Sequence, residues 1–244
     1  MYRFFCPYKN IARDKIIITD KQQGRHIRDV LRLKAGDAVV IFDDKSNEYD
    51  CRIIRILPTV VLSIQKRHLA LKGQRGLYLA VACAIPKKSK MDDIVDKLTQ
   101  LGVDRIIPLE TERVIIRLDK HKKMLRQKRW EKIAVSASEQ SQRKSVPIIG
   151  DIQDLKTALA GSVDFDLKLI AALTSDFRPL KEVLGRSRPK DILIFIGPEG
   201  DFSPAEVALA RQAGCIPVSL GELVLRVETA ALAAASFIRL YEET

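Results

Sequence analysis

Short apolar stretches separated by turn residues dominate the first 70 residues of the chain. They are rich in Val, Ile, Phe and Tyr, a composition typical of strands. A helix is expected among them, because His26, Val30 and Leu33 share one face at helical spacing. So many short strands favour a small β-barrel. The predicted strands are Arg3 to Cys6, Lys15 to Thr19, Asp37 to Phe42, Tyr49 to Ile56 and Val60 to Gln65.

The hydrophobic pattern changes beyond residues 72–76. Leu77 to Ile85 is almost continuously apolar, as expected for a strand in a sheet covered on both faces. Ser89 is expected to begin a helix that ends at Gly102, and Val103 to Leu109 returns as a strand, which completes a βαβ unit. The sequence therefore predicts two domains, residues 1–72 and residues 73–244.

The remaining residues alternate between helices and strands, which predicts an α/β fold around a parallel sheet. Ser203 and Glu206 form a capping box around Pro204, so a helix is expected to begin there. The other predicted helices are 122–141, 154–160, 179–184 and the alanine-rich 228–241, and the other predicted strands are 167–173, 191–196 and 215–220.

The net charge of +11 is unevenly distributed along the chain. Residues 1–72 hold 15 Lys and Arg against 8 Asp and Glu, and residues 113–144 hold 11 against 3. Residues 145–244 hold 10 against 14. Two basic zones indicate a polyanionic partner, since each phosphate contact releases condensed counterions. The alternative is a solvated basic surface that binds nothing.

Neither a membrane segment nor a metal site is expected from the sequence. No apolar run reaches the roughly 18 residues that a membrane helix needs, and the N-terminus has no secretory pattern, so a cytoplasmic protein is expected. The cysteines are widely separated and have no histidine at ligand spacing, which argues against zinc and indicates ordinary core positions. They are Cys6, Cys51, Cys83 and Cys215.

Two predicted strands run directly into glycine-containing loops. Ile192 to Ile196 leads into 197–200 (Gly-Pro-Glu-Gly), and Ile216 to Leu220 leads into Gly221. Ligands of open α/β sheets bind at the carboxyl ends of strands, and glycine allows a ligand to approach the backbone closely. Neither loop matches the dinucleotide or Walker pattern. Each glycine taken alone is also compatible with a plain turn.

Several ordered sequence blocks resemble the RsmE family, which comprises ribosomal small-subunit RNA (uracil-N3) methyltransferases of the SPOUT superfamily. The resemblance covers essentially the whole chain. Its blocks are 3–5 (Arg-Phe-Phe), 26–32 (His-Ile-Arg-Asp-Val-Leu-Arg), 86–91 (Pro-Lys-Lys-Ser-Lys-Met), Lys97, 101–103 (Leu-Gly-Val), 138–143 (Ser-Glu-Gln-Ser-Gln-Arg), Pro147, 196–200 (Ile-Gly-Pro-Glu-Gly), 220–221 (Leu-Gly), 225–226 (Leu-Arg) and 228–230 (Glu-Thr-Ala).

The resemblance implies an N-terminal PUA-like β-barrel that binds RNA and a C-terminal, trefoil-knotted SPOUT domain. It also implies a homodimer, for which the small-residue helix from Ala230 to Ile238 is a candidate packing surface. The chain departs from the family pattern at Gln100, Val224 and Val227, and above all at Asp201. There the family usually repeats glycine, so Asp201 adds a side chain and a charge beside the expected ligand loop.

The resemblance further implies S-adenosylmethionine as the cofactor, no metal, and small-subunit (16S) ribosomal RNA or the assembled small ribosomal subunit as the partner. The implied cofactor-binding residues are Leu173, Thr174, Ile196, Gly197, Pro198, Glu199, Gly200, Leu220, Gly221, Leu225 and Arg226. The residues expected near RNA are Arg3, His26, Arg28, Arg32, Lys88, Lys90 and Arg143.

The implied reaction places two demands on the protein. Uracil N3 must lose a proton, and the negative charge that develops on the flanking carbonyl oxygens must be stabilised. Arg226 is the candidate for the second task, because arginine stays charged and donates in a planar fork. Glu199 or Glu228 is the candidate proton acceptor, although each is also compatible with a purely structural role that holds loop amides.

Other functions remain open from the sequence. Another SPOUT activity, such as ribose 2′-O methylation, differs only in the product nucleoside. A non-catalytic RNA-binding assembly factor, in which Asp201 has removed cofactor affinity, differs in its response to S-adenosylmethionine. A dehydrogenase of the NAD type is a more distant alternative.

Overall fold

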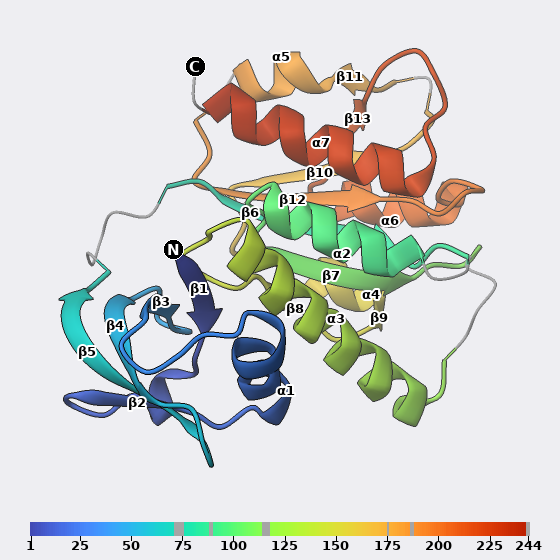
Figure 1. Ribbon diagram of the computed structural model, residues 1–244. Coiled ribbons are helices and arrows are strands. Elements are labelled where there is room, and N and C mark those ends of the chain that lie inside the picture. Colours follow the sequence, from blue (N-terminus) through green and yellow to red (C-terminus); the bar gives the residue numbers. More distant parts are fainter. Residues whose placement is uncertain (71–75, 88–89, 114–117, 175, 186–187, 243–244) are drawn as a thin grey trace. The chain divides into compact units, whose positions relative to one another are not determined.

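The computed structural model describes residues 1–244 except 71–75, 88–89, 114–117, 175, 186–187 and 243–244 (Figure 1). The chain forms two compact units. The first consists of Met1–Gln74 and Ser138–Val146, and the second of Arg75–Ala137 and Pro147–Thr244. The predicted boundary between residues 72 and 73 lies outside the described residues. The return of Ser138–Val146 to the first unit was not predicted.

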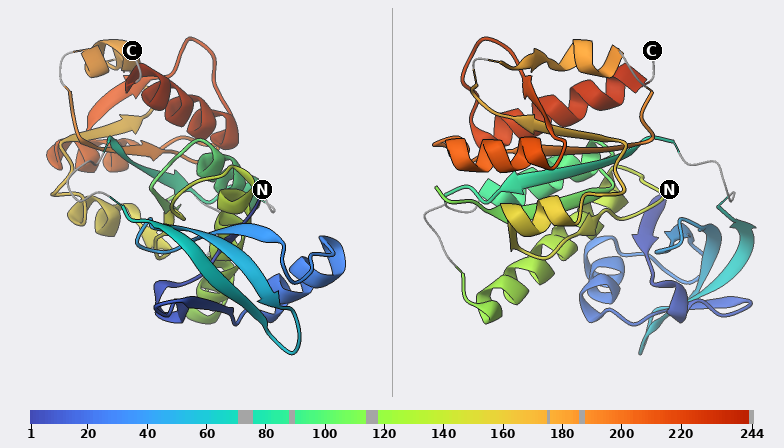
Figure 2. Two further views of the ribbon diagram at one scale, coloured as in Figure 1. Left: turned by 60° about the vertical axis from the view of Figure 1, so that its left-hand side comes forward. Right: turned by 180° about the vertical axis from the view of Figure 1, so that it is seen from behind.

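The first unit is built on a curled five-stranded sheet with the order β1-β3-β4-β5-β2 (Figures 1 and 2). β1 pairs in parallel with β3, and the other neighbours are antiparallel. Alternate residues of these strands, such as Ile16, Ile41 and Leu62, fill one core. The strands are β1 (Tyr2–Phe5), β2 (Lys15–Ile18), β3 (Ala38–Phe42), β4 (Glu48–Arg55) and β5 (Val60–His68), close to the predicted bounds.

A buried carboxylate closes the turn between β3 and β4. Asp43 is fully buried and accepts hydrogen bonds from the backbone N–H groups of Lys45 and Asn47, the Asn47 side chain and the Tyr49 hydroxyl. A buried carboxylate is stable only when its oxygens are hydrogen-bonded, and these donors meet that need. The predicted turn of polar residues therefore has a specific internal scaffold.

The predicted helical face in the first unit is wrong. A short α1 (Lys21–Arg25) continues into a π-helical turn, η2 (His26–Val30), and the preceding turn η1 (Tyr8–Asn10) is 3-10. Ile27 is the buried residue, whereas His26 is exposed and Val30 is 65% exposed. A π turn holds more residues than an α turn, so spacing at 3.6 residues misplaces the face. Arg32, at φ 53°, then redirects the chain before Leu33.

The second unit contains an eight-stranded parallel sheet, as predicted for an α/β fold. Its order is β11-β13-β10-β12-β6-β7-β8, and β9 also pairs with β7. The strands are β6 (Tyr78–Ala84), β7 (Arg105–Glu110), β8 (Ile148–Ile149), β9 (Gln153–Asp154), β10 (Leu167–Ala171), β11 (Arg178–Pro179), β12 (Asp191–Ile196) and β13 (Ile216–Ser219). The knot implied by the resemblance stays a prediction.

Helices cover both faces of this sheet, which explains why its central strands are apolar throughout (Figure 2). On one face, Phe195 of β12 packs into a cluster with residues of α4 and α6. On the other face α2 and α7 pack against each other, and α7 also lies on β6 and β12. The helices are α2 (Lys90–Gln100), α3 (Lys120–Gln140), α4 (Leu155–Ala160), α5 (Leu180–Gly185), α6 (Pro204–Gln212) and α7 (Val227–Glu242).

The two predicted helix starts have different outcomes. Ser203 accepts from the Glu206 N–H while the Glu206 carboxylate accepts from the Ser203 N–H, so the predicted capping box is confirmed. Ser89, the predicted start of α2, lies outside the described residues. The predicted core positions of the four cysteines are confirmed, since all four are free and buried.

Candidate functional site

One cavity opens in the second unit where three neighbouring parallel strands end. β13, β10 and β12 are adjacent in the sheet, so their carboxyl ends meet at one edge. The loops that follow them and the first turn of α7 enclose a cavity of about 510 Å³. That volume is within the range of about 300–1,000 Å³ usual for small-molecule sites.

The predicted cofactor-binding residues gather around this cavity. Leu173 and Thr174 follow β10, Ile196 ends β12 and residues 197–200 follow it, and Leu220, Gly221 and Leu225 follow β13. Arg226 is the exception, because it does not line the cavity although Leu225 and Val227 on either side of it do. The lining residues that the sequence did not single out as binding residues are Ala171, Ala172, Phe177, Asp201, Val218, Ser219, Glu222, Leu223, Val224, Val227 and Ala230. Most of these residues are chain neighbours of the predicted binding residues, so the positions of the two loops in the sequence were enough to locate them.

The two loop glycines are required for different reasons. A Cβ on Gly197 would lie 3.1 Å from the ring of Phe202 and 3.3 Å from its backbone N, so this glycine allows close packing within the protein. Gly221 has φ +132°, which side chains rarely adopt, and a Cβ there would meet nothing within 4 Å. Of these two loop glycines, Gly221 is therefore the one that combines an unusual backbone conformation with open space beside it.

The two candidate proton acceptors occupy different surroundings. The Lys90 ammonium lies 2.5 Å from the Glu228 carboxylate, and this hydrogen bond holds the pKa of Glu228 below its ordinary value. Glu228 does not line the cavity. Glu199 does, is exposed, and accepts a hydrogen bond of 3.3 Å from the Lys87 N–H. Of the two carboxylates, therefore, Glu199 is the one that faces the cavity.

Arg226 stands directly before α7, and its carbonyl accepts the Ala230 N–H at 2.8 Å. Its side chain is exposed, and among the described residues it forms no hydrogen bond or ion pair. The start of α7 therefore fixes the backbone of Arg226, and its exposed guanidinium retains donors for an external group.

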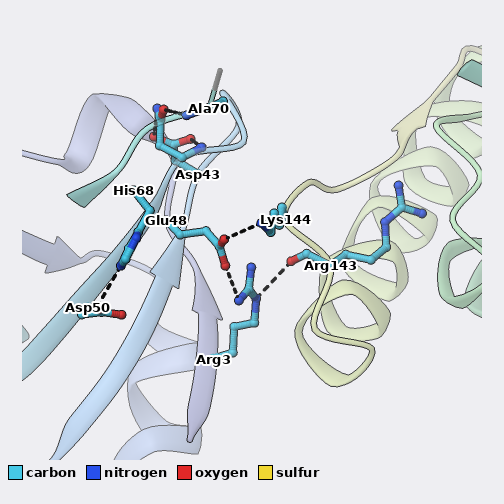
Figure 3. A network of polar contacts seen from close by, with 9 residues as sticks. Arg3, Asp43, Glu48, Asp50, His68, Ala70, Arg143 and Lys144 are labelled. Atoms are coloured by element: carbon cyan, nitrogen blue, oxygen red, sulfur yellow. Dashed lines mark hydrogen bonds and ion pairs between the residues drawn. The ribbon is translucent and has the colours of Figure 1, made fainter. Parts of the chain in front are cut away.

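In the first unit, the guanidinium of Arg3 is engaged by the protein itself (Figure 3). Arg3 is 2.6 Å from Glu48, donates to the carbonyl of Arg143 at 3.0 Å, and has a side chain only 11% exposed. Lys144 approaches the same Glu48 at 3.4 Å. Arg3 therefore joins β1 to the segment 138–146 and is poorly placed for phosphate contact, contrary to the sequence-based expectation.

Some of the other predicted RNA-contacting residues are exposed, and others are partly buried or paired with a carboxylate. His26, Arg28 and Arg32 are exposed. Arg143 is half-buried, and its guanidinium points away from Glu48 in Figure 3. Lys90, in the second unit, is held by Glu228, and Lys88 lies outside the described residues.

A second cavity, also of about 510 Å³, lies in the first unit between α1 and the ends of β2 and β5. Arg28 lines it together with Lys21 and Arg25, which the sequence had not singled out. Arg28 pairs with Asp29 at 2.5 Å, but both side chains are at least 40% exposed. Such a surface pair is weak and exchanges readily for another anion.

The long helix α3 carries the second basic zone. Lys122, Lys123 and Arg129 form ion pairs with nearby carboxylates. Lys128 and Lys132, one turn apart, are both exposed, and within the described part of the chain neither has an ion-pair partner. The zone therefore retains cations free for an external polyanion.

Neither a metal cluster nor a membrane span is found among the described residues. No group of His, Cys, Asp and Glu side chains within that part of the chain is arranged to hold a metal ion. Every helix in that part of the chain is too short or too polar to cross a bilayer.

Comparison with known proteins identifies the chain. Residues 74–239 match the model of the RNA methyltransferase domain, and residues 18–63 match the RNA methyltransferase PUA domain. The ribosomal RNA small subunit methyltransferase E of Bacillus subtilis is 30% identical over 89% of this chain and 87% of its own length. The chain belongs to this methyltransferase family. The Rickettsia conorii member is also 30% identical, over 98% of this chain and 95% of its own length.

Solved structures agree with this family assignment. The family member from Neisseria gonorrhoeae, crystallised with S-adenosyl methionine, has a TM-score of 0.83 and 28% identity, with 99% of this chain and 98% of that chain covered. A Legionella pneumophila protein in complex with the bound cofactor SAM has a TM-score of 0.87 and 28% identity over 98% and 97% of the two chains. The predicted fold class, a PUA-like domain followed by a SPOUT-type α/β domain, is confirmed for this chain.

Proposed function

We propose that this methyltransferase transfers a methyl group from S-adenosylmethionine to N3 of a uridine in small-subunit ribosomal RNA. The observation that carries the proposal is the cavity at the ends of β10, β12 and β13. It unites loops that are separate in the sequence, and it lies within the region that matches the methyltransferase family. Relatives of the same family and fold have been crystallised with this cofactor.

The cavity residues fit such a cofactor. Open space beside Gly221 leaves its backbone accessible, and the walls provide apolar side chains such as Leu225 for an adenine ring. Backbone groups at strand ends provide hydrogen bonds to the polar parts. The bound cofactor supplies an electrophilic methyl group, and the protein supplies position and electrostatics.

The protein's own contribution to the reaction is assigned to two residues. Glu199 accepts the N3 proton, because it lines the cavity and is exposed. Arg226 stabilises negative charge on the uracil oxygens, because its guanidinium is exposed and its chain neighbours Leu225 and Val227 both line the cavity. Glu228, held by Lys90, fixes local structure instead.

Uracil N3 lies on the base-pairing edge, so the target must be unpaired or flipped when it reacts. The RNA phosphates are bound by exposed cations of the first unit, including Arg28 and Arg32, and by Lys128 and Lys132 of α3. Arg3 is left out because it is buried against Glu48. This reaction belongs in the cytoplasm, where ribosomal RNA is assembled, and it needs no metal.

A homodimer is part of the proposal. Its support, besides the family resemblance, is the apolar surface of α7, where Leu240 is 65% exposed and Phe237 is 38% exposed. Exposed apolar residues on a helix are usual at subunit interfaces. Analytical ultracentrifugation is expected to give twice the chain mass, and Leu240→Glu is expected to weaken the association. A monomer at all concentrations would contradict this part.

Cofactor binding is tested by calorimetry with a matched pair of variants. Ala230 lines the cavity from α7, whereas Ala208 is exposed on α6 and lies outside it. Ala230→Phe fills space that the cofactor needs and is expected to weaken S-adenosylmethionine binding at least about tenfold, which corresponds to roughly 1.4 kcal/mol of binding free energy. Ala208→Phe is expected to bind like the unaltered protein. Equal affinities in both variants would place the cofactor elsewhere.

A further inference from the structure

Asp201 occupies an unusual backbone position at the edge of the cavity. Its N–H donates to the carbonyl of Pro198 at 3.0 Å, which closes a turn after β12, and its φ is 59°. This left-handed region favours glycine, although aspartate tolerates it better than most residues. The turn itself therefore does not require an aspartate.

The Asp201 carboxylate joins this turn to a different strand end. Its Oδ2 accepts a hydrogen bond from the backbone N–H of Leu173 at 2.9 Å. Leu173 follows β10 and lines the same cavity, as does Asp201. One side chain thus connects the loops that follow β10 and β12, which form two walls of the cavity.

Beyond Leu173 the same loop is anchored by the ion pair between Asp176 and Arg211 of α6, whereas the contact from Asp201 acts on Leu173 itself. The Leu173 side chain is 68% exposed, so apolar packing holds it weakly. The next residue, Thr174, donates its N–H to the carbonyl of Ala172 at 3.0 Å, a tight turn that constrains the loop only locally. A charge-assisted hydrogen bond such as that from Leu173 to Asp201 is stronger than a neutral one.

We propose that Asp201 is a positioning residue for the cofactor cavity. Its carboxylate holds the Leu173–Thr174 wall in the conformation that receives the ligand. The exposed Leu173 side chain cannot fix this wall by packing, so the hydrogen bond from its backbone to Asp201 does so instead. The inference rests on the proposed function only where it concerns S-adenosylmethionine. The contact between the two loops exists in the protein without any ligand.

Two variants separate the hydrogen bond from the charge and from the backbone conformation. Asp201→Gly suits the positive φ and removes the contact, so the fold is expected to survive. Asp201→Asn removes the charge but retains a side-chain oxygen that can accept the Leu173 N–H, and asparagine also tolerates this φ. Thermal unfolding of both variants verifies that the fold is intact.

The first measurement is hydrogen exchange of the Leu173 amide in the free protein, followed by NMR. Exchange is expected to accelerate at least about tenfold in Asp201→Gly, since a bond worth about 1–2 kcal/mol in other proteins converts to that factor. It is expected to accelerate less in Asp201→Asn, because the amide oxygen still accepts the Leu173 N–H, although in a weaker, neutral hydrogen bond. Unaltered exchange in Asp201→Gly would overturn the proposal.

The second measurement is the affinity for S-adenosylmethionine by calorimetry. Asp201→Gly is expected to bind about tenfold more weakly, and Asp201→Asn is expected to restore most of the affinity. Tighter binding by Asp201→Gly would overturn the proposal, because the carboxylate would then compete with the ligand for the Leu173 N–H. Equal losses in both variants would overturn it as well, since the charge rather than the contact would matter. If the unaltered protein binds no S-adenosylmethionine, the proposed function fails, whereas amide exchange still decides whether Asp201 holds the wall.

Discussion

The ammonium of Lys90 and the carboxylate of Glu228 lie 2.5 Å apart and join the beginnings of α2 and α7. Both helices pack on the same face of the sheet. The two side chains are partly exposed, at 37% and 26%. The pair therefore stabilises the approach of the two helices modestly and keeps Glu228 charged.

The pair lowers the pKa of Glu228 and disfavours it as the proton acceptor, the role proposed for Glu199, which lines the cavity. Glu199→Gln is expected to lower single-turnover methyl transfer about 10²-fold or more, the usual contribution of a general base. Glu228→Gln is expected to lower it far less and to keep the pH dependence of the rate. The comparison is made at saturating RNA and cofactor across pH. A larger loss in Glu228→Gln would reverse the assignment.

Arg226 is expected to act in the transition state rather than in cofactor binding. Arg226→Ala should lower the turnover rate by about 10² to 10³, the scale of losing one preorganised donor, while the affinity for S-adenosylmethionine stays nearly constant. Arg226→Lys should restore only part of the rate, because a point charge cannot bridge neighbouring oxygens as a guanidinium does. Weakened cofactor binding with an unaltered chemical step would show instead that Arg226 shapes the pocket.

The sequence predicted elements with strong periodicity well. The longer strands of both units, the capping box at Ser203 and the two loops around Gly197 and Gly221 follow from local residue patterns, whereas the two-residue strands β8, β9 and β11 were not predicted. The position of the cavity could be predicted because the carboxyl ends of parallel strands meet at one edge of the sheet. The π turn at His26 was missed, since nothing local in the sequence indicates a wider helical turn.

Local sequence patterns did not predict which side chains pair when they are far apart in the chain. The burial of Arg3 depends on Glu48, and the restraint on Glu228 depends on Lys90, which is 138 residues away in the chain. Neither partner is identifiable from the spacing around the other. The reason for Gly197 was likewise hidden, because it is the ring of Phe202 that approaches this glycine.

Phosphate contacts by the free cations predict a steep salt dependence of RNA binding. The double variants Arg28→Glu/Arg32→Glu and Lys128→Glu/Lys132→Glu should each weaken binding and reduce the slope of log affinity against log salt by about one for every phosphate that is no longer neutralised. Cofactor affinity should stay unaltered. Lys156→Glu, an exposed position on α4, is the control. A slope unaffected by either double variant would mean that these cations only face solvent.

Glu139 provides a pH-dependent test of the first unit. Burial raises its pKa, and hydrogen bonds from the Phe5 N–H and the Gln23 side chain only partly oppose this. A carboxyl group with a raised folded-state pKa destabilises the fold as pH rises through that value, and the penalty is absent below its ordinary pKa. Glu139→Gln should therefore unfold at a higher temperature than the unaltered protein at pH 7, and the difference should vanish at acidic pH.

The control for this variant is Glu131→Gln, at an exposed position of the same helix. It is expected to leave the unfolding temperature nearly constant across the same pH range. Lower stability of Glu139→Gln at pH 7 would mean that the hydrogen bonds to the charged carboxylate outweigh the penalty of burying it.

The most direct test is to identify the methylated nucleoside. The protein is incubated with S-adenosylmethionine labelled in the methyl group and with small ribosomal subunits, or their isolated RNA, from a strain that lacks this modification. The RNA is then digested and analysed by mass spectrometry. Label is expected in 3-methyluridine, with its loss in Arg226→Ala and its retention in Ala208→Phe. Label in a 2′-O-methyl nucleoside, or no label with either substrate although the protein binds S-adenosylmethionine, would contradict the proposed function.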